Sequence, residues 1–280
     1  MKYIIFTDLD GTLLDQHTYS FEKATEALAL AKENEIPIVL CTSKTQAEIE
    51  EYRERMHNDD PFIPENGGAI IIPKNYFKSV FDKKGNYPIR ENQYIIIELG
   101  TPYEIILDTL TKIKKSTNAI IRGFSDLTPE EISKITGLSI TSAILSKKRF
   151  YSEPIIIKGG TETINNVKKR ILASGLNFLE GGRFHHVFGS ITDKGKAVST
   201  LINIYKENAN DSIKTIGLGD SLIDLPMLAA VDIPVLVKKT SGNYDRRIQI
   251  ANLIYADDIG PEGWNKAILK ILNNISFKKR

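Results

Sequence analysis

The sequence has little of what several function classes require. It contains one cysteine, Cys41, so no disulfide can form within the chain. Its formal net charge is only +2, which gives no strongly basic surface for nucleic acid. No apolar run approaches the roughly 20 residues of a membrane-spanning helix. The first apolar stretch starts at the N-terminus and leaves no room for a signal peptide, so we expect a cytoplasmic protein.

Motifs of several common enzyme classes are also missing. Nothing matches G-x-x-x-x-G-K-[ST], and no G-x-G-x-x-G follows the first apolar run, so neither a P-loop nor a dinucleotide site is supported. No cluster of histidine and cysteine suits zinc. What remains is an ordinary globular composition, 41% hydrophobic and 26% charged over 280 residues. That length allows one large domain or two smaller ones.

The most informative stretch lies at the N-terminus. The short apolar run Tyr3–Phe6 is typical of a buried parallel strand. Asp8 and Asp10 follow it, at the strand end where open α/β sheets bind ligands. Two such carboxylates repel each other unless they share a cation or a proton, which favours a divalent metal site. The alternative is an ordinary acidic turn. An EF-hand loop does not fit, because Gly11 directly follows Asp10.

Apolar runs alternate with helical patterns on both sides of a middle region. Ile36–Cys41 and Ile213–Leu218 are typical of buried strands, and the helical spacing around them predicts βαβ units. We therefore expect an α/β fold with a doubly wound, mostly parallel sheet. Between about 83 and 187 the pattern is that of a small α+β domain, with a strand at Tyr94–Leu99. We predict a core of residues 1–82 and 188–280, interrupted by a domain of residues 83–187.

Polar side chains are predicted to meet at one edge of the core sheet. They follow strands or begin helices, and they are Asp8, Asp10, Thr42, Lys194, Asp220 and Asp224. Carboxylates, a hydroxyl and an ammonium together suit a magnesium ion and a phosphate group. Backbone N–H groups at the start of the helix after Thr42 and Ser43 also suit an anion. Capping of that helix by either hydroxyl would explain these two residues equally well.

These residues, in this order, resemble the four motifs of the haloacid dehalogenase superfamily of phosphatases. The matching pieces are D-L-D-G-T at 8–12, Thr42, Lys194 and G-D-x-x-x-D at 219–224. The resemblance covers both core segments and implies the Rossmann-like core of that superfamily. One position departs from the pattern: Ile223 stands where the family usually has Asn, which removes a polar group near the metal.

The resemblance implies a role for each motif residue. Asp8 would be the nucleophile that forms an aspartyl-phosphate, and Asp10 the general acid and base. The cofactor would be Mg2+, bound by the side chains of Asp8 and Asp220 and by the backbone of Asp10, with Asp224 in the outer shell. Phosphate would be bound by Thr42, Ser43 and Lys194.

The long insertion between Thr42 and Lys194 resembles the α/β cap of the branch that acts on sugar phosphates. Strings within and beside it, such as P-F-I-P-E-N-G-G at 61–68 and R-x-x-S-E-P at 149–154, resemble enzymes that hydrolyse the phosphate monoester of mannosyl-3-phosphoglycerate. The implied partner is therefore a small phosphorylated sugar-glycerate. The other readings are glucosyl-3-phosphoglycerate or another sugar phosphate as substrate, or a non-catalytic phosphosugar-binding protein.

Candidate substrate-binding residues are chosen by their chemistry. A glycerate carboxylate suits Arg or Lys, and sugar hydroxyls suit carboxylates and amides. The candidates are Glu65, Asn66, Arg149, Glu153, Lys158, Arg183 and His185, with His186 as the alternative histidine. Arg149 and Glu153 could instead form a surface pair at i,i+4, and the histidines could be half-buried in a strand. Substrate entry further predicts hinge motion near 80–85 and 187–190.

Overall fold

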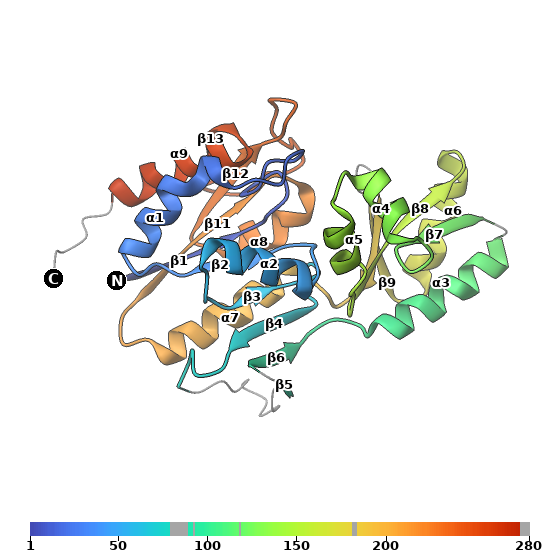
Figure 1. Cartoon of the computed structure of the whole chain (residues 1–280), viewed down its shortest axis with the longest axis horizontal. Helices are drawn as coiled ribbons and strands as arrows, with labels where there is room; N and C mark the ends of the chain where they lie inside the picture. The colour runs from blue at the N-terminus through green and yellow to red at the C-terminus, as the bar shows by residue number, and fades with distance from the viewer. Residues whose placement is uncertain (79–88, 92, 118, 181–183, 275–280) are drawn as a thin grey trace.

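A computed structural model describes residues 1–78, 89–91, 93–117, 119–180 and 184–274, and it contains a large and a small β-sheet (Figure 1). The large sheet has nine strands in the order β13-β12-β11-β1-β2-β3-β4-β6-β5. Neighbours from β13 to β3 are parallel, and β4, β6 and β5 pair antiparallel. The strands are β1 (Lys2–Thr7), β2 (Ile38–Cys41), β3 (Phe62–Ile63), β4 (Ala69–Pro73), β5 (Ile89–Glu91), β6 (Tyr94–Glu98), β11 (Ile213–Gly219), β12 (Ile233–Lys238) and β13 (Ile254–Ile259). The predicted doubly wound α/β core is confirmed.

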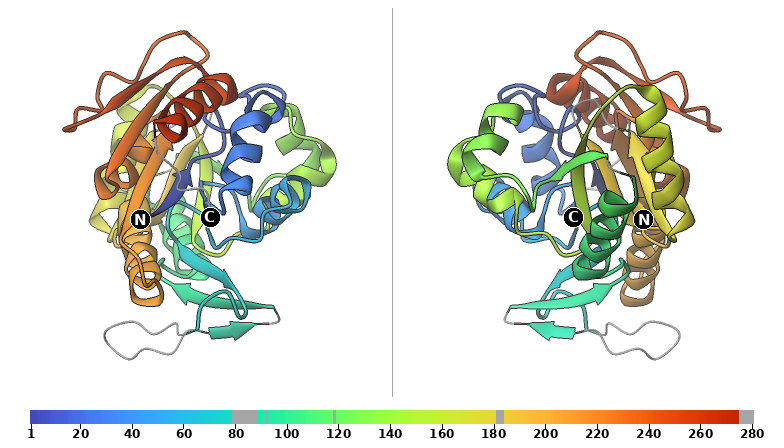
Figure 2. Two further views of the ribbon diagram at one scale, coloured as in Figure 1. Left: turned by 90° about the vertical axis from the view of Figure 1, so that its left-hand side faces the viewer. Right: turned by 90° about the vertical axis from the view of Figure 1, so that its right-hand side faces the viewer.

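Helices cover both faces of the large sheet (Figure 2). On one face, α1 (Thr25–Glu33), α2 (Gln46–Met56) and α9 (Gly260–Asn273) pack on one apolar core, and on the other α7 (Lys194–Asn208) and α8 (Leu225–Ala230) pack on a second. Alternate residues of β1 enter the two cores: Ile5 lies in the first, and Ile4 and Phe6 in the second. This explains why the strand is continuously apolar.

The small sheet is antiparallel, in the order β7-β8-β10-β9. We call residues 101–189, which contain it, the insert. Its strands are β7 (Ile120–Gly123), β8 (Ser152–Lys158), β9 (Leu176–Glu180) and β10 (His185–Gly189). The helices α3 (Tyr103–Thr117) and α6 (Thr161–Ala173) share its apolar core. The short helices α4 (Pro129–Thr136) and α5 (Ile140–Ser146) form a smaller core with Phe124 and Phe184.

The predicted domain boundary at 82/83 and the predicted hinge at 80–85 lie outside the described residues.

One strand lies in a different sheet from the one expected. The strand expected inside the insertion at Tyr94–Leu99 is β6, and it pairs with β4 of the large sheet, from Ala69 opposite Glu98 to Pro73 opposite Tyr94. The apolar pattern indicated a strand but carried no information about its partner, because antiparallel pairs arise between any two suitable strands.

The two segments that join the insert to the large sheet pack closely on each other, and Gly100 in the first of them packs on Gly68, which precedes β4. A Cβ atom on Gly68 would lie 2.5 Å from Cβ of Tyr151, and one on Gly100 would lie 3.0 Å from Cα of Gly68. A Cβ atom on Gly189 would lie 2.0 Å from Oγ1 of Thr101. Glycine is required where neighbouring atoms approach the backbone this closely.

Among the helices that the structure describes, none has the length and apolar character needed to cross a membrane.

Candidate active site

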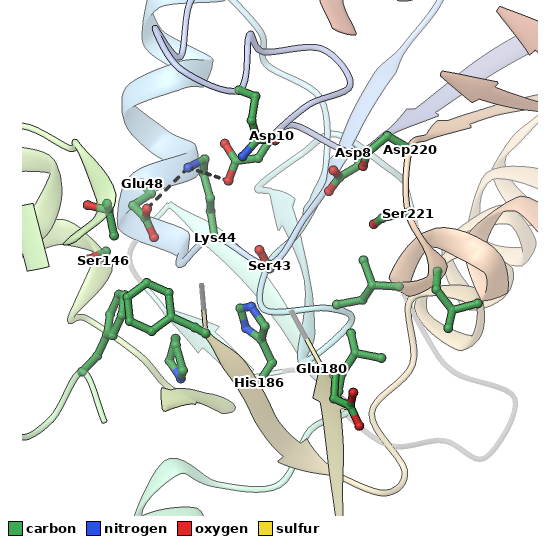
Figure 3. Close-up of a pocket in the computed structure, with 18 of the residues that line it drawn as sticks. Asp8, Asp10, Ser43, Lys44, Glu48, Ser146, Glu180, His186, Asp220 and Ser221 are labelled. Carbon is green, nitrogen blue, oxygen red and sulfur yellow. Dashed lines mark ion pairs between the residues drawn. The ribbon is translucent and has the colours of Figure 1, made fainter. Parts of the chain in front are cut away.

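Three buried carboxylates meet at the carboxyl edge of the large sheet. Asp8 follows β1 and Asp220 follows β11, and these strands pair in parallel, with Thr7 opposite Leu218. Asp224 ends the short 3-10 helix η2 (Leu222–Asp224). One oxygen from each carboxylate lies within 4.8 Å of the other two. Figure 3 shows Asp8 and Asp220 facing each other at this edge.

A buried lysine joins two of these carboxylates. Lys194 is the first residue of α7 and is only 2% exposed. Its Nζ lies 2.8 Å from Asp8 Oδ1 and 2.7 Å from Asp224 Oδ1. The other oxygen of Asp224 accepts hydrogen bonds from the backbone N–H groups of Asp220 and Ser221 and from the Ser221 hydroxyl, each at 3.1 Å. Both oxygens of Asp224 are therefore already engaged.

The net negative charge of this cluster favours the binding of a cation. When all three carboxylates are ionised, they and the Lys194 ammonium together carry two negative charges in a buried space. The pKa of Asp8 is raised to about 7: burial is the largest cause, Lys194 opposes it, and Asp224 adds to it. Burial, followed by Asp224 and Asp8, raises the pKa of Asp220 well above its usual value. Protein oxygens alone in this arrangement suit a hard divalent cation, so the donor set fits Mg2+.

Asp10 lies beside Lys44, apart from Asp8 and Asp220 (Figure 3). Its Oδ2 is 3.0 Å from the Nζ of Lys44, and its Oδ1 is buried without a hydrogen-bond partner among the described residues. The chain turns sharply after it at Gly11, where φ is +78° and a Cβ atom would lie 3.1 Å from Asp220 Oδ2. Only glycine fits this turn comfortably, which explains the D-x-D-G order.

Neither Thr42 nor Ser43, the two hydroxyl residues predicted to bind phosphate, caps the helix that follows β2. Helix α2 is capped by Thr45, whose side chain accepts from the N–H of Glu48 while the Glu48 carboxylate accepts from the N–H of Thr45. The alternative that Thr42 or Ser43 caps this helix is therefore wrong. Ser43 lines the cavity described next, whereas Thr42 is fully buried and its hydroxyl accepts from the N–H of Lys44 at 3.4 Å.

A cavity of about 660 Å³ separates this edge from the insert. Its walls come from both parts of the chain. The large-sheet side includes Asp8, Asp10, Ser43, Lys44, Glu48 and Asp220 (Figure 3). The insert side includes Phe124, Arg149, Glu180, Phe184 and His186. The wall from the insert is thus partly aromatic and carries cationic and imidazole groups. It can accommodate an organic group much larger than phosphate.

Of the predicted substrate-binding residues, Arg149 reaches the cavity. It donates to Ser152 Oγ at 2.7 Å and approaches the backbone oxygen of Ser43 at 3.4 Å, so it faces the large sheet from the insert. Its Nε is buried without a partner among the residues described. The guanidinium lies 5.5 Å from the Phe124 ring centre. Arg149 therefore offers a donor beside an aromatic wall.

Glu65 and Glu153 bind other parts of the protein. Glu65 accepts from the N–H groups of Phe150 and Tyr151 at 2.8 and 3.1 Å and from the Ser152 hydroxyl at 2.7 Å, so it ties the large sheet to the insert. Glu153 accepts from the hydroxyl groups of Tyr103 and Ser125 inside the insert, at 2.7 and 2.6 Å. The i,i+4 surface pair suggested for Arg149 and Glu153 is also wrong, since both residues are buried and bind other groups.

The remaining candidates divide by strand register and position. His185 stacks on Phe178 with ring centres 4.8 Å apart, whereas His186 lines the cavity, because adjacent residues of β10 face opposite ways. Lys158 is exposed at the end of β8 and does not line the cavity. Asn66 is buried, and neither polar atom of its side chain has a partner among the described residues. Arg183 lies outside the described residues.

Lys44 and Glu48 are site residues that the sequence interpretation missed. Lys44 is 5% exposed, and its Nζ lies between the carboxylates of Asp10 and Glu48, at 3.0 and 3.7 Å. Burial would lower the pKa of Lys44, but the carboxylates of Asp10 and Glu48 outweigh it and raise the pKa. The i,i+4 spacing of the two residues was the available signal, but the same spacing is common on solvent-exposed helix faces.

The pKa of His186 makes the fold sensitive to acid. Burial, followed by the charge of Arg149, lowers it to about 3. The unfolded chain, with a pKa near 6.5, therefore binds more protons below that pH, and the free energy of unfolding falls as pH falls from about 6.5 towards 3. Between pH 6.5 and 5, the free energy of unfolding of His186→Gln should fall by about 1 kcal/mol less than that of wild type, allowing for partial exposure of His186. Urea unfolding at several pH values measures it, and equal slopes for His186→Gln and wild type would contradict it.

The fold and the site define a class of protein. The family model of haloacid dehalogenase-like hydrolases matches residues 5–256, and the chain belongs to this family. A solved phosphatase of the superfamily from Bacteroides thetaiotaomicron superposes with a TM-score of 0.67 at 19% identity, covering 98% of this chain and 96% of that one. A solved subclass IIB sugar phosphatase gives 0.65 at 18% identity, covering 98% and 100%. At such identities the similarity shows the fold.

The curated relatives are more specific. A glucosyl-3-phosphoglycerate/mannosyl-3-phosphoglycerate phosphatase of Methanococcoides burtonii is 49% identical over 98% of this chain and 100% of its own length. A protein of the same name from Persephonella marina is 40% identical over 97% and 98%. The mannosyl-3-phosphoglycerate phosphatase of Pyrococcus furiosus is 36% identical over 85% and 91%.

Proposed function

We propose that this protein is a magnesium-dependent phosphatase that converts mannosyl-3-phosphoglycerate to mannosylglycerate and phosphate. We include glucosyl-3-phosphoglycerate as a second substrate, because two of the relatives carry both names. The observation that carries the proposal is the placement of Asp8. It combines a buried carboxylate at a strand end, a lysine at 2.8 Å and two further carboxylates, beside a cavity large enough for a sugar-glycerate.

Asp8 is the nucleophile in this proposal. Its carboxylate forms a bond to phosphorus while the bond from phosphorus to the glycerate oxygen breaks, giving an aspartyl-phosphate. Asp10 donates a proton to the departing oxygen. In the second step Asp10 takes a proton from water, the water oxygen bonds to phosphorus, and the bond to Asp8 breaks. Oδ1 of Asp10 is buried whereas the side chain as a whole is 30% exposed, so Oδ2 is the oxygen open to the cavity and available for both proton transfers.

The charge around the phosphoryl group is balanced by residues already in place. Asp8, Asp220 and the backbone carbonyl of Asp10 would hold Mg2+. Asp224 would act from the outer shell, because both of its oxygens already accept hydrogen bonds. Bound Mg2+ supplies positive charge to the transferring phosphoryl group. Lys194 and Ser43 would bind phosphoryl oxygens, and Thr42, which is buried behind Ser43, would support them. Positioning and electrostatic stabilisation dominate the catalysis of phosphoryl transfer.

The insert is proposed to be the cap that selects the substrate. We place its boundaries at the joining segments near residues 100 and 189 rather than at 83, because β6 belongs to the large sheet. Arg149 is the candidate for the glycerate carboxylate, and His186 for a sugar hydroxyl. Both line the cavity, and each has a nitrogen without a partner among the residues described. Glu65, which binds the backbone of the insert, is proposed to be structural.

Phosphate release tests this function. With mannosyl-3-phosphoglycerate and Mg2+ we expect turnover, and we expect a loss of at least about 100-fold after chelation by EDTA, restored by Mg2+, because charge stabilisation is withdrawn. The glucosyl compound should also be hydrolysed, and 3-phosphoglycerate, which lacks the sugar, should be a poorer substrate. Calorimetric binding of the sugar compounds with no phosphate release would contradict the proposal and identify a binding protein.

A further inference from the structure

We propose that Lys44 is a positioning residue: it binds the cavity-facing oxygen of Asp10 and so fixes the orientation of this carboxylate towards the leaving group. The inference rests on the phosphatase function proposed above. The two oxygens of Asp10 have different surroundings. Oδ2 lies 3.0 Å from the Nζ of Lys44, and Oδ1 is buried without a partner among the described residues. Because the Asp10 side chain is 30% exposed, Oδ2 is the oxygen open to the cavity, and its contact with Lys44 fixes the direction in which it points.

Lys44 is itself held in place from several sides. Its Nζ lies 3.7 Å from Glu48 (Figure 3). The other oxygen of Glu48 accepts from the N–H of Thr45 at 2.9 Å in the cap of α2. The rings of Tyr19 and Tyr52 lie with their centres 5.1 and 5.7 Å from the same Nζ. A lysine that is 5% exposed between two carboxylates and two aromatic rings has one conformation. Because Lys44 is held in one position, its contact with Asp10 also fixes the Asp10 side chain.

The setting of Lys44 also extends to the insert. Tyr19, whose ring covers the Nζ, donates from its hydroxyl to the backbone oxygen of Thr136 in α4 at 3.2 Å. The wall that fixes Asp10 thus includes a contact that exists only when the insert is seated. The other cations at the cavity pair elsewhere: Lys239 and Arg247 bind Asp245, Lys168 binds Glu180, and Arg149 lies 3.7 Å from Glu65. Lys44 is distinguished from them by its contact with the proposed acid.

The test compares leaving groups. The alkoxide of a sugar-glycerate needs a proton to depart, whereas the nitrophenolate of p-nitrophenyl phosphate departs without one. We expect Lys44→Met to lower kcat/KM for mannosyl-3-phosphoglycerate by about 100-fold, the size of a general-acid contribution, and for p-nitrophenyl phosphate by less than about 5-fold. Lys44→Arg should recover most of the loss. Lys23→Met, which removes an exposed lysine paired with Glu262, is the matched control and should change neither value.

A second readout does not depend on activity. In a crystal structure of Lys44→Met, the Asp10 carboxylate should be rotated or present in two conformations. An unchanged Asp10 in that structure, or equal losses with both substrates, would overturn the inference. A rise in KM for the sugar substrate with kcat unchanged would also overturn it, because Lys44 would then bind substrate directly. Failure of the phosphatase proposal is recognised separately, as an absence of turnover by the wild-type protein.

Discussion

Replacing Asp8 by asparagine is expected to abolish phosphate release while leaving the protein folded. An amide has almost the shape of a carboxylate, but it cannot form the acyl-phosphate bond, so turnover should fall by at least about 10⁴-fold. The fold should tolerate the change. Burial already disfavours the charged form of Asp8, and Lys194 keeps its contact with Asp224 at 2.7 Å. Phosphate release and thermal unfolding, measured on the same preparation, give the two readouts.

The control for this variant is chemical. The amide introduced by Asp8→Asn can revert to the carboxylate by deamidation, so mass spectrometry must accompany the assay. Asp8→Glu is a useful second variant, because it keeps the charge but displaces the carboxylate by one methylene. Near-normal activity in undeamidated Asp8→Asn would show that another residue attacks phosphorus. Loss of folding together with loss of activity would show a structural role instead.

Replacing Lys194 by methionine is expected to have the largest effect on stability. The variant leaves Asp8 and Asp224 facing each other in a buried space with their shared partner removed. Removal of one member of a buried ion pair typically costs about 3–5 kcal/mol. Activity should be lost as well, because the ammonium no longer balances the phosphoryl oxygens.

Urea unfolding with and without Mg2+ measures this effect. Saturating Mg2+ should stabilise Lys194→Met, since a divalent cation compensates the same carboxylates. Lys23→Met again serves as the control, because its side chain is 68% exposed and its loss should leave the unfolding midpoint unchanged. An unfolding midpoint of Lys194→Met equal to that of wild type would show that the buried carboxylates are neutral in the folded protein.

The approach of Asp8 to Asp220 could be predicted from the sequence, because both residues occupy strand ends. Asp8 and Asp220 follow apolar runs, and parallel neighbours bring such positions together whatever the details of packing. The partner of β6 could not be predicted in the same way, since an alternating strand pairs with any complementary edge. His185 and His186 differ by one residue, and only the register of β10 decides which of them meets the cavity.

Contacts between the two parts of the chain were also beyond sequence reasoning. Glu65 and Arg149 were both chosen for their chemistry as substrate ligands. In the fold, Glu65 binds the backbone at Phe150 and Tyr151, whereas Arg149 keeps one nitrogen without a partner among the described residues. Lys44 was missed for a related reason. Its role depends on Asp10, a partner far earlier in the chain, which no local pattern records.

The close packing at Gly68, Gly100 and Gly189 has a consequence for the hinge motion predicted from the sequence. The chain enters the insert at Gly100 and leaves it at Gly189, so a rotation of the insert about these points would move nearby groups least. Arg149 lies two residues from Tyr151, which packs on Gly68, and it would stay close to the phosphate-binding edge. The hydrogen bonds from Tyr19 to Thr136 and from Thr45 to Leu145 lie away from these points, and opening would break them. The proposed substrate ligand Arg149 would thus move little, while the wall formed by α4 and α5 would move further.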